Sequence, residues 1–168
     1  MGRHEEDEGL SGADVGHGQE GVTIMDLTGR PDDAPDTRSL ASAPAVRAPD
    51  GSLVRPLCRI AGRGSFAHFR LEPGETAQAV SHATVSEIWY VVGGRGAMWR
   101  RPQGRDPVTV DLEPGVCLTI PARTAFQFRA HPGGEPLAVV AVTMPPWPSG
   151  HADEARPERG PWTPGFRP

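Results

Sequence analysis

Residues 73–96 read PGETAQAVSHATVSEIWYVVGGRG, and this stretch decides the fold that we expect for the chain. A Pro-Gly turn leads into a polar segment that contains His82. Five residues later Glu87 opens the apolar run IWYVV, which ends in a glycine hairpin. Histidine and glutamate are residue types that bind metal ions or move protons. The stretch therefore predicts a β-strand with a reactive pair, His82 and Glu87, at its beginning.

Short apolar runs continue on both sides of this stretch, separated every eight to twelve residues by turns rich in Gly and Pro. The expected strands are residues 57–61, 65–71, 87–92, 97–101, 108–111, 117–120, 125–130 and 137–143. No segment shows the apolar period of a helix. Many short strands at this spacing are typical of an antiparallel sandwich or barrel.

The apolar residues gather in the middle of the 168-residue chain, which has the length of one domain. We expect residues 1–50 to be a disordered or draping N-terminal segment, within which residues 21–27 form a short edge strand. Residues 51–146 are expected to form the barrel. Residues 147–168 are rich in Pro and Trp, which predicts an extended, largely irregular tail whose aromatic side chains dock on the barrel.

Charge and composition exclude several classes of function. The net charge of −4 argues against a nucleic-acid partner, and Arg100, Arg101 and Arg105 fit a solvated loop. No apolar run reaches the roughly 18 residues of a membrane span, and the acidic start of the chain has no signal-peptide core. Both cysteines, Cys58 and Cys117, stand in apolar runs and are expected to be reduced core residues. We therefore expect a cytoplasmic protein.

Two sequence patterns resemble the motifs of the cupin family, small jelly-roll barrels of bacteria and plants. The first, G-x5-H-x-H-x3-4-E-x6-G, is matched by His82, Glu87 and Gly94. The second, G-x5-P-x-G-x2-H-x3-N, is matched by Gly115 and Pro121. The segments SEIWYVVGGRGAMWRR, LTIPARTAFQFR and VTMPPWP look like those of small bacterial cupins without a defined activity. The resemblance implies an all-β, antiparallel jelly-roll barrel.

The departures from these motifs concern the metal ligands. Val80 stands at the first histidine of the family, Phe126 at the second-motif histidine and Ala130 at its asparagine, while Arg123 replaces a glycine. Two remaining ligands rarely hold a divalent metal, because catalytic sites typically use three. The resemblance thus implies a degenerate site for Fe, Mn, Ni or Zn, weak or absent.

Strand alternation indicates which side chains line the interior. If Glu87 points inward, so does Trp89, and Phe126 and Phe128 of a later strand share the pocket. On the strand at 65–71, one set of alternate residues includes His68 and the other is more apolar, and the pattern leaves both open. With His68 inward, the metal site could regain a third ligand.

These residues support two hypotheses of function. In the first, the protein is an enzyme that binds a small organic molecule in the barrel. His82 and Glu87 would then catalyse an isomerase-, cyclase- or dehydratase-type acid–base reaction, or a metal-dependent one. In the second, it is a non-catalytic ligand-binding or accessory cupin without metal. Because residues 88–92 are apolar on both faces, we also expect a homodimer.

Overall fold

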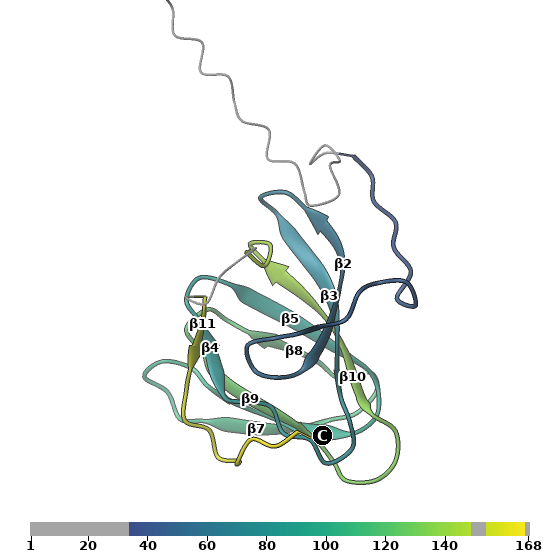
Figure 1. Cartoon of the computed structure of the whole chain (residues 1–168). Helices are drawn as coiled ribbons and strands as arrows, with labels where there is room; N and C mark the ends of the chain where they lie inside the picture. The colour runs from purple at the N-terminus through teal and green to yellow at the C-terminus, as the bar shows by residue number, and fades with distance from the viewer. Residues whose placement is uncertain (1–33, 149–153, 167–168) are drawn as a thin grey trace, which may run out of the picture.

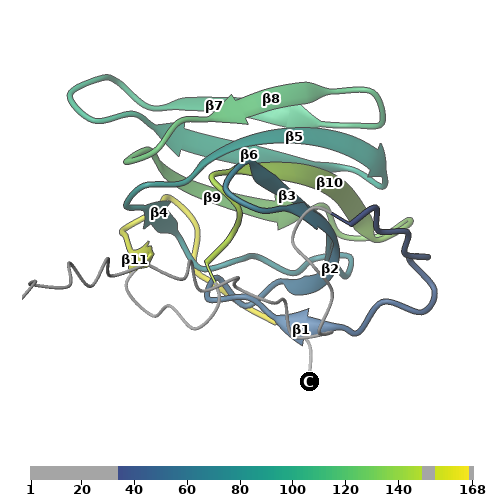
Figure 2. The ribbon, with the colours of Figure 1, turned by 90° about the horizontal axis from the view of Figure 1, so that it is seen from above.

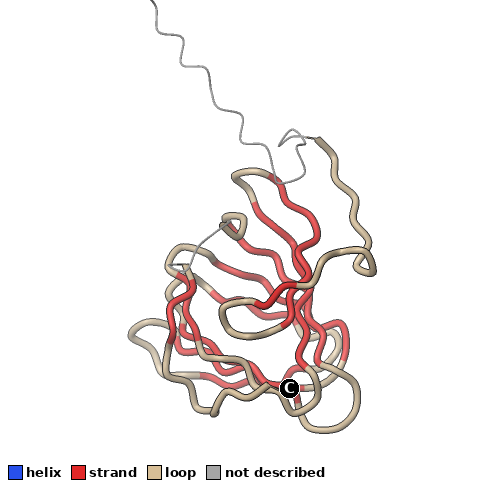
Figure 3. Tube along the Cα trace, viewed as in Figure 1, coloured by secondary structure: helices blue, strands red, loops and turns tan. Residues whose placement is uncertain are grey.

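The computed structural model describes residues 34–148 and 154–166, which consist of strands and loops (Figure 3). No helix in these ranges is long and apolar enough to cross a membrane. The strands are β1 (Val46–Arg47), β2 (Leu53–Ile60), β3 (Gly64–Leu71), β4 (Val80–His82), β5 (Ser86–Gly93), β6 (Gly96–Arg101), β7 (Val108–Leu112), β8 (Cys117–Ile120), β9 (Ala125–Ala130), β10 (Leu137–Met144) and β11 (Ala155–Pro157).

The strands form two antiparallel sheets that face each other across one core (Figures 1 and 2). The six-stranded sheet has the order β1-β2-β3-β10-β5-β8 and the five-stranded sheet the order β11-β4-β9-β6-β7. Trp89 and Val91 of the first sheet meet Met98, Phe126 and Phe128 of the second in the core. The prediction of an all-β barrel of antiparallel strands is confirmed.

All eight expected strands are present, and β2 differs most from its prediction because it begins at Leu53 instead of Leu57. Pro56 lies inside this strand, opposite Ala67 of β3, and the register shifts between Pro56 and Arg59. A proline lacks the N–H of a regular ladder, and a bulge accommodates it. The local sequence therefore predicted that β2 begins after Pro56, whereas in the sheet the strand already begins at Leu53.

Strands β1, β4 and β11 have no counterpart among the predicted ones. Each is short and depends on pairing with a distant segment, a signal that local patterns lack. Strand β11 belongs to the tail that was expected to be irregular, yet Ala155–Pro157 pairs with Val80–His82 of β4. Strand β1 lies before residue 51, where the barrel was expected to begin. The expected edge strand at residues 21–27 lies outside the described residues, as does the expected N-terminal segment up to residue 33.

The cysteine prediction is partly wrong. Both cysteines are free, but Cys58 is half-buried and Cys117 is exposed. Cys117 pairs with Tyr90 at the edge strand β8, on the outer face of the six-stranded sheet. An apolar run does not reveal which of its alternate positions faces outward.

Candidate functional site

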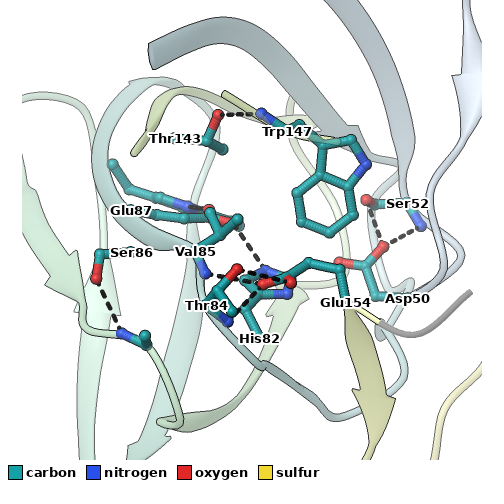
Figure 4. Close-up of polar contacts among 12 residues, drawn as sticks. Asp50, Ser52, His82, Thr84, Val85, Ser86, Glu87, Thr143, Trp147 and Glu154 are labelled. Atoms are coloured by element: carbon teal, nitrogen blue, oxygen red, sulfur yellow. Dashed lines mark hydrogen bonds and ion pairs between the residues drawn. The ribbon is translucent and has the colours of Figure 1, made fainter. Parts of the chain in front are cut away.

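The turn between β4 and β5 brings His82 and Glu87 together. His82 is the last residue of β4 and Glu87 the second residue of β5. The buried carboxylate of Glu154 holds this turn from the C-terminal segment (Figure 4). It accepts hydrogen bonds from the backbone N–H of Thr84 (2.8 Å), the Thr84 hydroxyl (2.9 Å) and the backbone N–H of Val85 (2.8 Å).

His82 and Glu87 form a buried pair. His82 Nε2 lies 2.8 Å from Glu87 Oε1, and the two residues are 6% and 3% exposed. The indole N–H of Trp89 donates to the other carboxylate oxygen of Glu87. A buried carboxylate needs such partners, since burying an unpaired charge is costly. Both oxygens of Glu87 are therefore held in place by side chains of the barrel interior.

Two aromatic rings enclose the His82 imidazole. The ring of Phe126 lies 5.2 Å away and the ring of Trp147 4.9 Å away, both edge-to-face. The backbone N–H of Trp147 donates to the hydroxyls of Ser65 (2.9 Å) and Thr143 (3.2 Å), which fixes this residue beyond the end of β10. His82 Nδ1 is buried and has no hydrogen-bond partner among the described residues.

Two further buried carboxylates lie close to the pair, Asp50 and Glu154 (Figure 4). Burial raises the pKa of Asp50, and the charge of Glu87 adds to this, although hydrogen bonds from Ser52 act against it. Burial also acts to raise the pKa of Glu154, but its hydrogen bonds and the nearby His82 outweigh burial and lower that pKa. Sequence reasoning missed Asp50 and Glu154 because they come from segments outside the expected barrel. It expected Trp147 to dock on the barrel but did not place this ring against His82.

The predicted aromatic wall lies inside the barrel. Trp89, Phe126 and Phe128 are almost fully buried, and the Trp89 ring meets the rings of Phe126 and Phe128 at 6.2 and 4.9 Å. Phe69 stacks on Trp89 from the six-stranded sheet at 5.3 Å. These residues pack against one another as part of the core, and Phe126 extends this packing to the His82 ring.

His68 does not join the pair. Phe69 packs on the core and Leu71 is fully buried, so strand alternation directs His68 to the outer face. There it pairs with Arg55 of β2, and burial, followed by the charges of Arg70 and Arg55, lowers the pKa of His68. Of the two sets of alternate residues on β3, the more apolar one, which includes Phe69 and Leu71, faces inward. The set with His68 and Arg70 faces outward because burying charged side chains in the core is costly.

The donor set at the pair does not fit a tightly held metal. The described residues contain no group of three or more His, Cys, Asp or Glu side chains arranged to hold a metal ion. His82 and Glu87 contact each other, and the Thr84 hydroxyl donates to Glu154. Phe126 occupies the inward position at which the family has its second-motif histidine. A tetrahedral or octahedral ion would lack ligands here.

The family model described as "Cupin domain" matches residues 67–143. This match agrees with the two-sheet barrel, and residues 67–143 form a cupin domain, as the sequence resemblance implied. No curated protein matches the sequence.

Solved structures of two proteins share the fold. A mutant of the Bacillus subtilis oxalate decarboxylase OxdC matches with a TM-score of 0.59 and 15% identity, over 74% of this chain and 33% of that chain. The capsular polysaccharide assembling protein CapF of Staphylococcus aureus matches with a TM-score of 0.51 and 17% identity, over 60% of this chain and 30% of that chain. The chain thus spans about a third of the length of these proteins, and at such identities the likeness shows the fold alone.

Proposed function

We propose that this cupin binds a small organic molecule beside His82 and moves a proton on it, with Glu87 as the partner of the histidine. The observation behind this proposal is the buried imidazole, whose Nε2 lies on Glu87 and whose Nδ1 has no hydrogen-bond partner in the described part of the chain. A buried polar atom without a partner is rare in proteins, and a bound ligand would supply the missing hydrogen bond. CapF is also known in complex with a small organic inhibitor, 3-isopropenyl-tropolone.

The roles of the two residues follow from their contacts. With Nε2 donating to Glu87, His82 Nδ1 presents a lone pair that can accept a proton from a ligand C–H or O–H group. Glu87 stabilises the imidazolium that forms, and the hydrogen bond from Trp89 keeps the carboxylate in position. Return of the proton to another carbon completes an isomerisation, and its delivery to a ligand hydroxyl, whose C–O bond breaks so that water leaves, completes a dehydration. In a cyclisation the deprotonated hydroxyl oxygen bonds to a carbonyl carbon of the same ligand, and the carbonyl oxygen takes the proton. No step requires a metal.

Access to His82 is expected to depend on Trp147. Of the two rings against the imidazole, Phe126 is buried in the core whereas Trp147 is half-buried. A ligand that reaches Nδ1 would contact or displace the Trp147 ring. The aromatic surroundings favour a ligand with an apolar portion and a few polar groups, as in most small-molecule sites.

The alternative is a binding protein without catalysis. The observation in its favour is that Phe126 stands at the histidine position of the second motif, so the interior has lost reactive groups and kept apolar ones. Under this alternative Glu87 has only the structural role of accepting hydrogen bonds from the side chains of His82 and Trp89. Replacement of Glu87 by Gln separates the two, because general acid–base catalysis contributes about 10²- to 10⁴-fold to a rate.

We further propose that two copies pair through the outer face of the six-stranded sheet. Phe66, Ile88, Tyr90 and Val92 are all exposed there, and contiguous exposed apolar side chains mark interaction surfaces. A second copy would bury the same side chains in a two-fold contact.

The first test is a screen of small organic acids, sugars and aromatic compounds against protein labelled with ¹⁵N-histidine. A ligand of the site shifts the His82 imidazole signals and leaves those of His68 unchanged. The Glu87→Gln variant should still bind such a ligand and lose turnover. If no compound class perturbs His82 while the protein is folded, the proposal fails.

Metal content, measured by mass spectrometry on untagged wild type and His82→Ala, tests the proton-transfer mechanism separately. We expect well below one Fe, Mn, Ni or Zn per chain in both proteins. A near-stoichiometric metal in wild type that His82→Ala lacks would contradict a metal-free mechanism.

A further inference from the structure

A second candidate site lies outside the barrel, beside β4 and β11 of the five-stranded sheet, which run next to each other in Figure 1. It is an open hollow of about 550 Å³. Its walls come from β4, the loop after β6, the loop before β9, and β11 with the residues that follow it. Four of its lining residues are arginines, namely Arg101, Arg105, Arg123 and Arg156.

The hollow carries more positive charge than its own acid can balance. Glu158 is the acidic lining residue. One of its carboxylate oxygens lies 3.6 Å from Arg101 and the other accepts the Ser81 hydroxyl at 2.8 Å. The side chains of Arg105, Arg123 and Arg156 make no ion pair or hydrogen bond with the described residues, and all three are exposed. Within the part of the chain that the structure describes, three cations thus remain without a partner around one hollow, in a protein whose net charge is −4.

The backbone at Arg123 supplies a second observation. Arg123 has a φ of 63°, and among the described residues other than glycine it is the one with positive φ. It stands at the motif position where the related pattern has glycine, the residue that adopts this conformation without strain. Its backbone N–H donates to the carbonyl of His82 at 2.8 Å, which fixes the loop against β4. Strained residues gather at functional sites, and here the strain positions a guanidinium at the hollow.

We infer that this hollow binds a small polyanion, a molecule with at least two phosphate or carboxylate groups. The planar guanidinium group pairs with either group through two parallel hydrogen bonds. Three arginines on separate segments, none paired with a described residue, suit a ligand with several charged groups more than a single-charge ion. The concave shape and small volume suit a small molecule.

This site is separate from the His82–Glu87 pair. His82 lines the hollow, but its imidazole is directed to Glu87 inside the barrel. The polyanion would therefore bind on the other side of β4 from the reactive pair. Its binding neither requires nor tests the proposed acid–base chemistry.

Isothermal titration of the full chain with pyrophosphate, and separately with citrate, tests the inference. At least one of the two should bind saturably at one site per chain. Arg123→Gln and Arg156→Gln should each weaken that binding about tenfold, the cost of one charge-assisted hydrogen bond. The control is Arg63→Gln, because Arg63 is exposed in the turn before β3 and does not line the hollow.

The outcomes separate cleanly. Tighter binding of pyrophosphate assigns the site to phosphate groups, and tighter binding of citrate assigns it to carboxylates. Absence of saturable binding by both anions overturns the inference. Equal weakening in Arg63→Gln and the two hollow variants also overturns it, because that result reflects overall charge. Since Arg123 and Arg156 lie on different segments, unfolding of one variant leaves the other as the test.

Discussion

The outer faces of the two sheets contrast sharply. On the six-stranded sheet Ile88, Tyr90 and Val92 are 41%, 47% and 47% exposed. On the five-stranded sheet Gln127 is fully buried beneath the chain's own C-terminal segment, and the Arg129 guanidinium lies 4.4 Å from the Trp162 ring of that segment. One face thus shows apolar side chains to solvent, whereas the other covers polar ones.

The difference shows that residue type alone does not decide which surface is buried. Gln127 is satisfied under the segment because its amide donates to the carbonyls of Ala77 (2.9 Å) and Trp162 (2.8 Å), and its oxygen accepts the Trp162 N–H (3.0 Å). Polar groups can be buried when every hydrogen bond is made. The apolar outer face has no such intramolecular cover among the described residues, which is why we propose a second copy for it.

The largest expected effect comes from removing the hydrogen bonds by which Gln127 holds the C-terminal segment on the five-stranded sheet. Gln127→Ala removes three hydrogen bonds and leaves backbone groups of Ala77 and Trp162 without partners, so we expect a loss of about 3 kcal/mol in the free energy of unfolding. Urea denaturation followed by tryptophan fluorescence measures it. The control Gln103→Ala changes an exposed loop residue and should cost under about 0.5 kcal/mol. Equal effects would mean that the segment does not protect the sheet.

A second effect concerns the anchor between the C-terminal segment and the β4–β5 turn. Glu154→Gln loses the charge that accepts three hydrogen bonds from Thr84 and Val85, and we expect a cost of about 2 kcal/mol at neutral pH. The pKa of Glu154 is lowered below its ordinary value of 4.5, so the wild-type contribution is complete above about 4.5 and disappears as pH falls through the lower folded value. Thermal unfolding of both proteins from neutral to acidic pH should show that the difference in stability between the wild type and Glu154→Gln becomes smaller. A stability difference that does not change with pH would contradict this role of the Glu154 charge.

The exposed face is tested by association. Tyr90→Lys should weaken a dimer at least tenfold, because a buried lysine charge at the centre of an apolar contact is unpaired. Light scattering after size-exclusion chromatography gives the mass of each species. Val108→Lys alters a residue that is 46% exposed on β7 of the other sheet, and this variant should remain dimeric. A monomeric wild type would leave the apolar face without the proposed partner.

The smallest effect is expected at Asp50, the buried carboxylate close to the His82–Glu87 pair. Its pKa is raised by burial above 3.8, so the folded protein retains this proton more strongly than the unfolded chain. Stability therefore falls as pH rises through the folded pKa. Asp50→Asn, which keeps an oxygen for the Ser52 donors, should be more stable than the wild type at neutral pH and no more stable in acid. A loss at neutral pH would show that the charge is needed.

The strands of the barrel were predictable because each consists of a local alternation bounded by Gly or Pro. The pairing of Glu87 with His82 followed the same logic, since both belong to one continuous stretch. The position of His68 was not predictable, because alternate residues on its strand gave two plausible faces. Glu154 and Asp50 were beyond local reasoning, since each reaches the site from a segment with no strand pattern of its own. Trp147 was expected to dock on the barrel, but its contact with His82 was not predictable from the local sequence.

By itself, the sequence determined an all-β barrel, the cupin motifs with their missing ligands, and the reactive pair at the start of a strand. These features depend on residues that are close together along the chain, because the alternation of side chains in a strand determines which ones point to the same face. The tertiary structure alone decided that the C-terminal segment covers one sheet, that Trp147 closes over His82, and that arginines from separate segments surround one hollow. Those contacts join residues far apart in sequence, and only the completed packing of the two sheets brings them together.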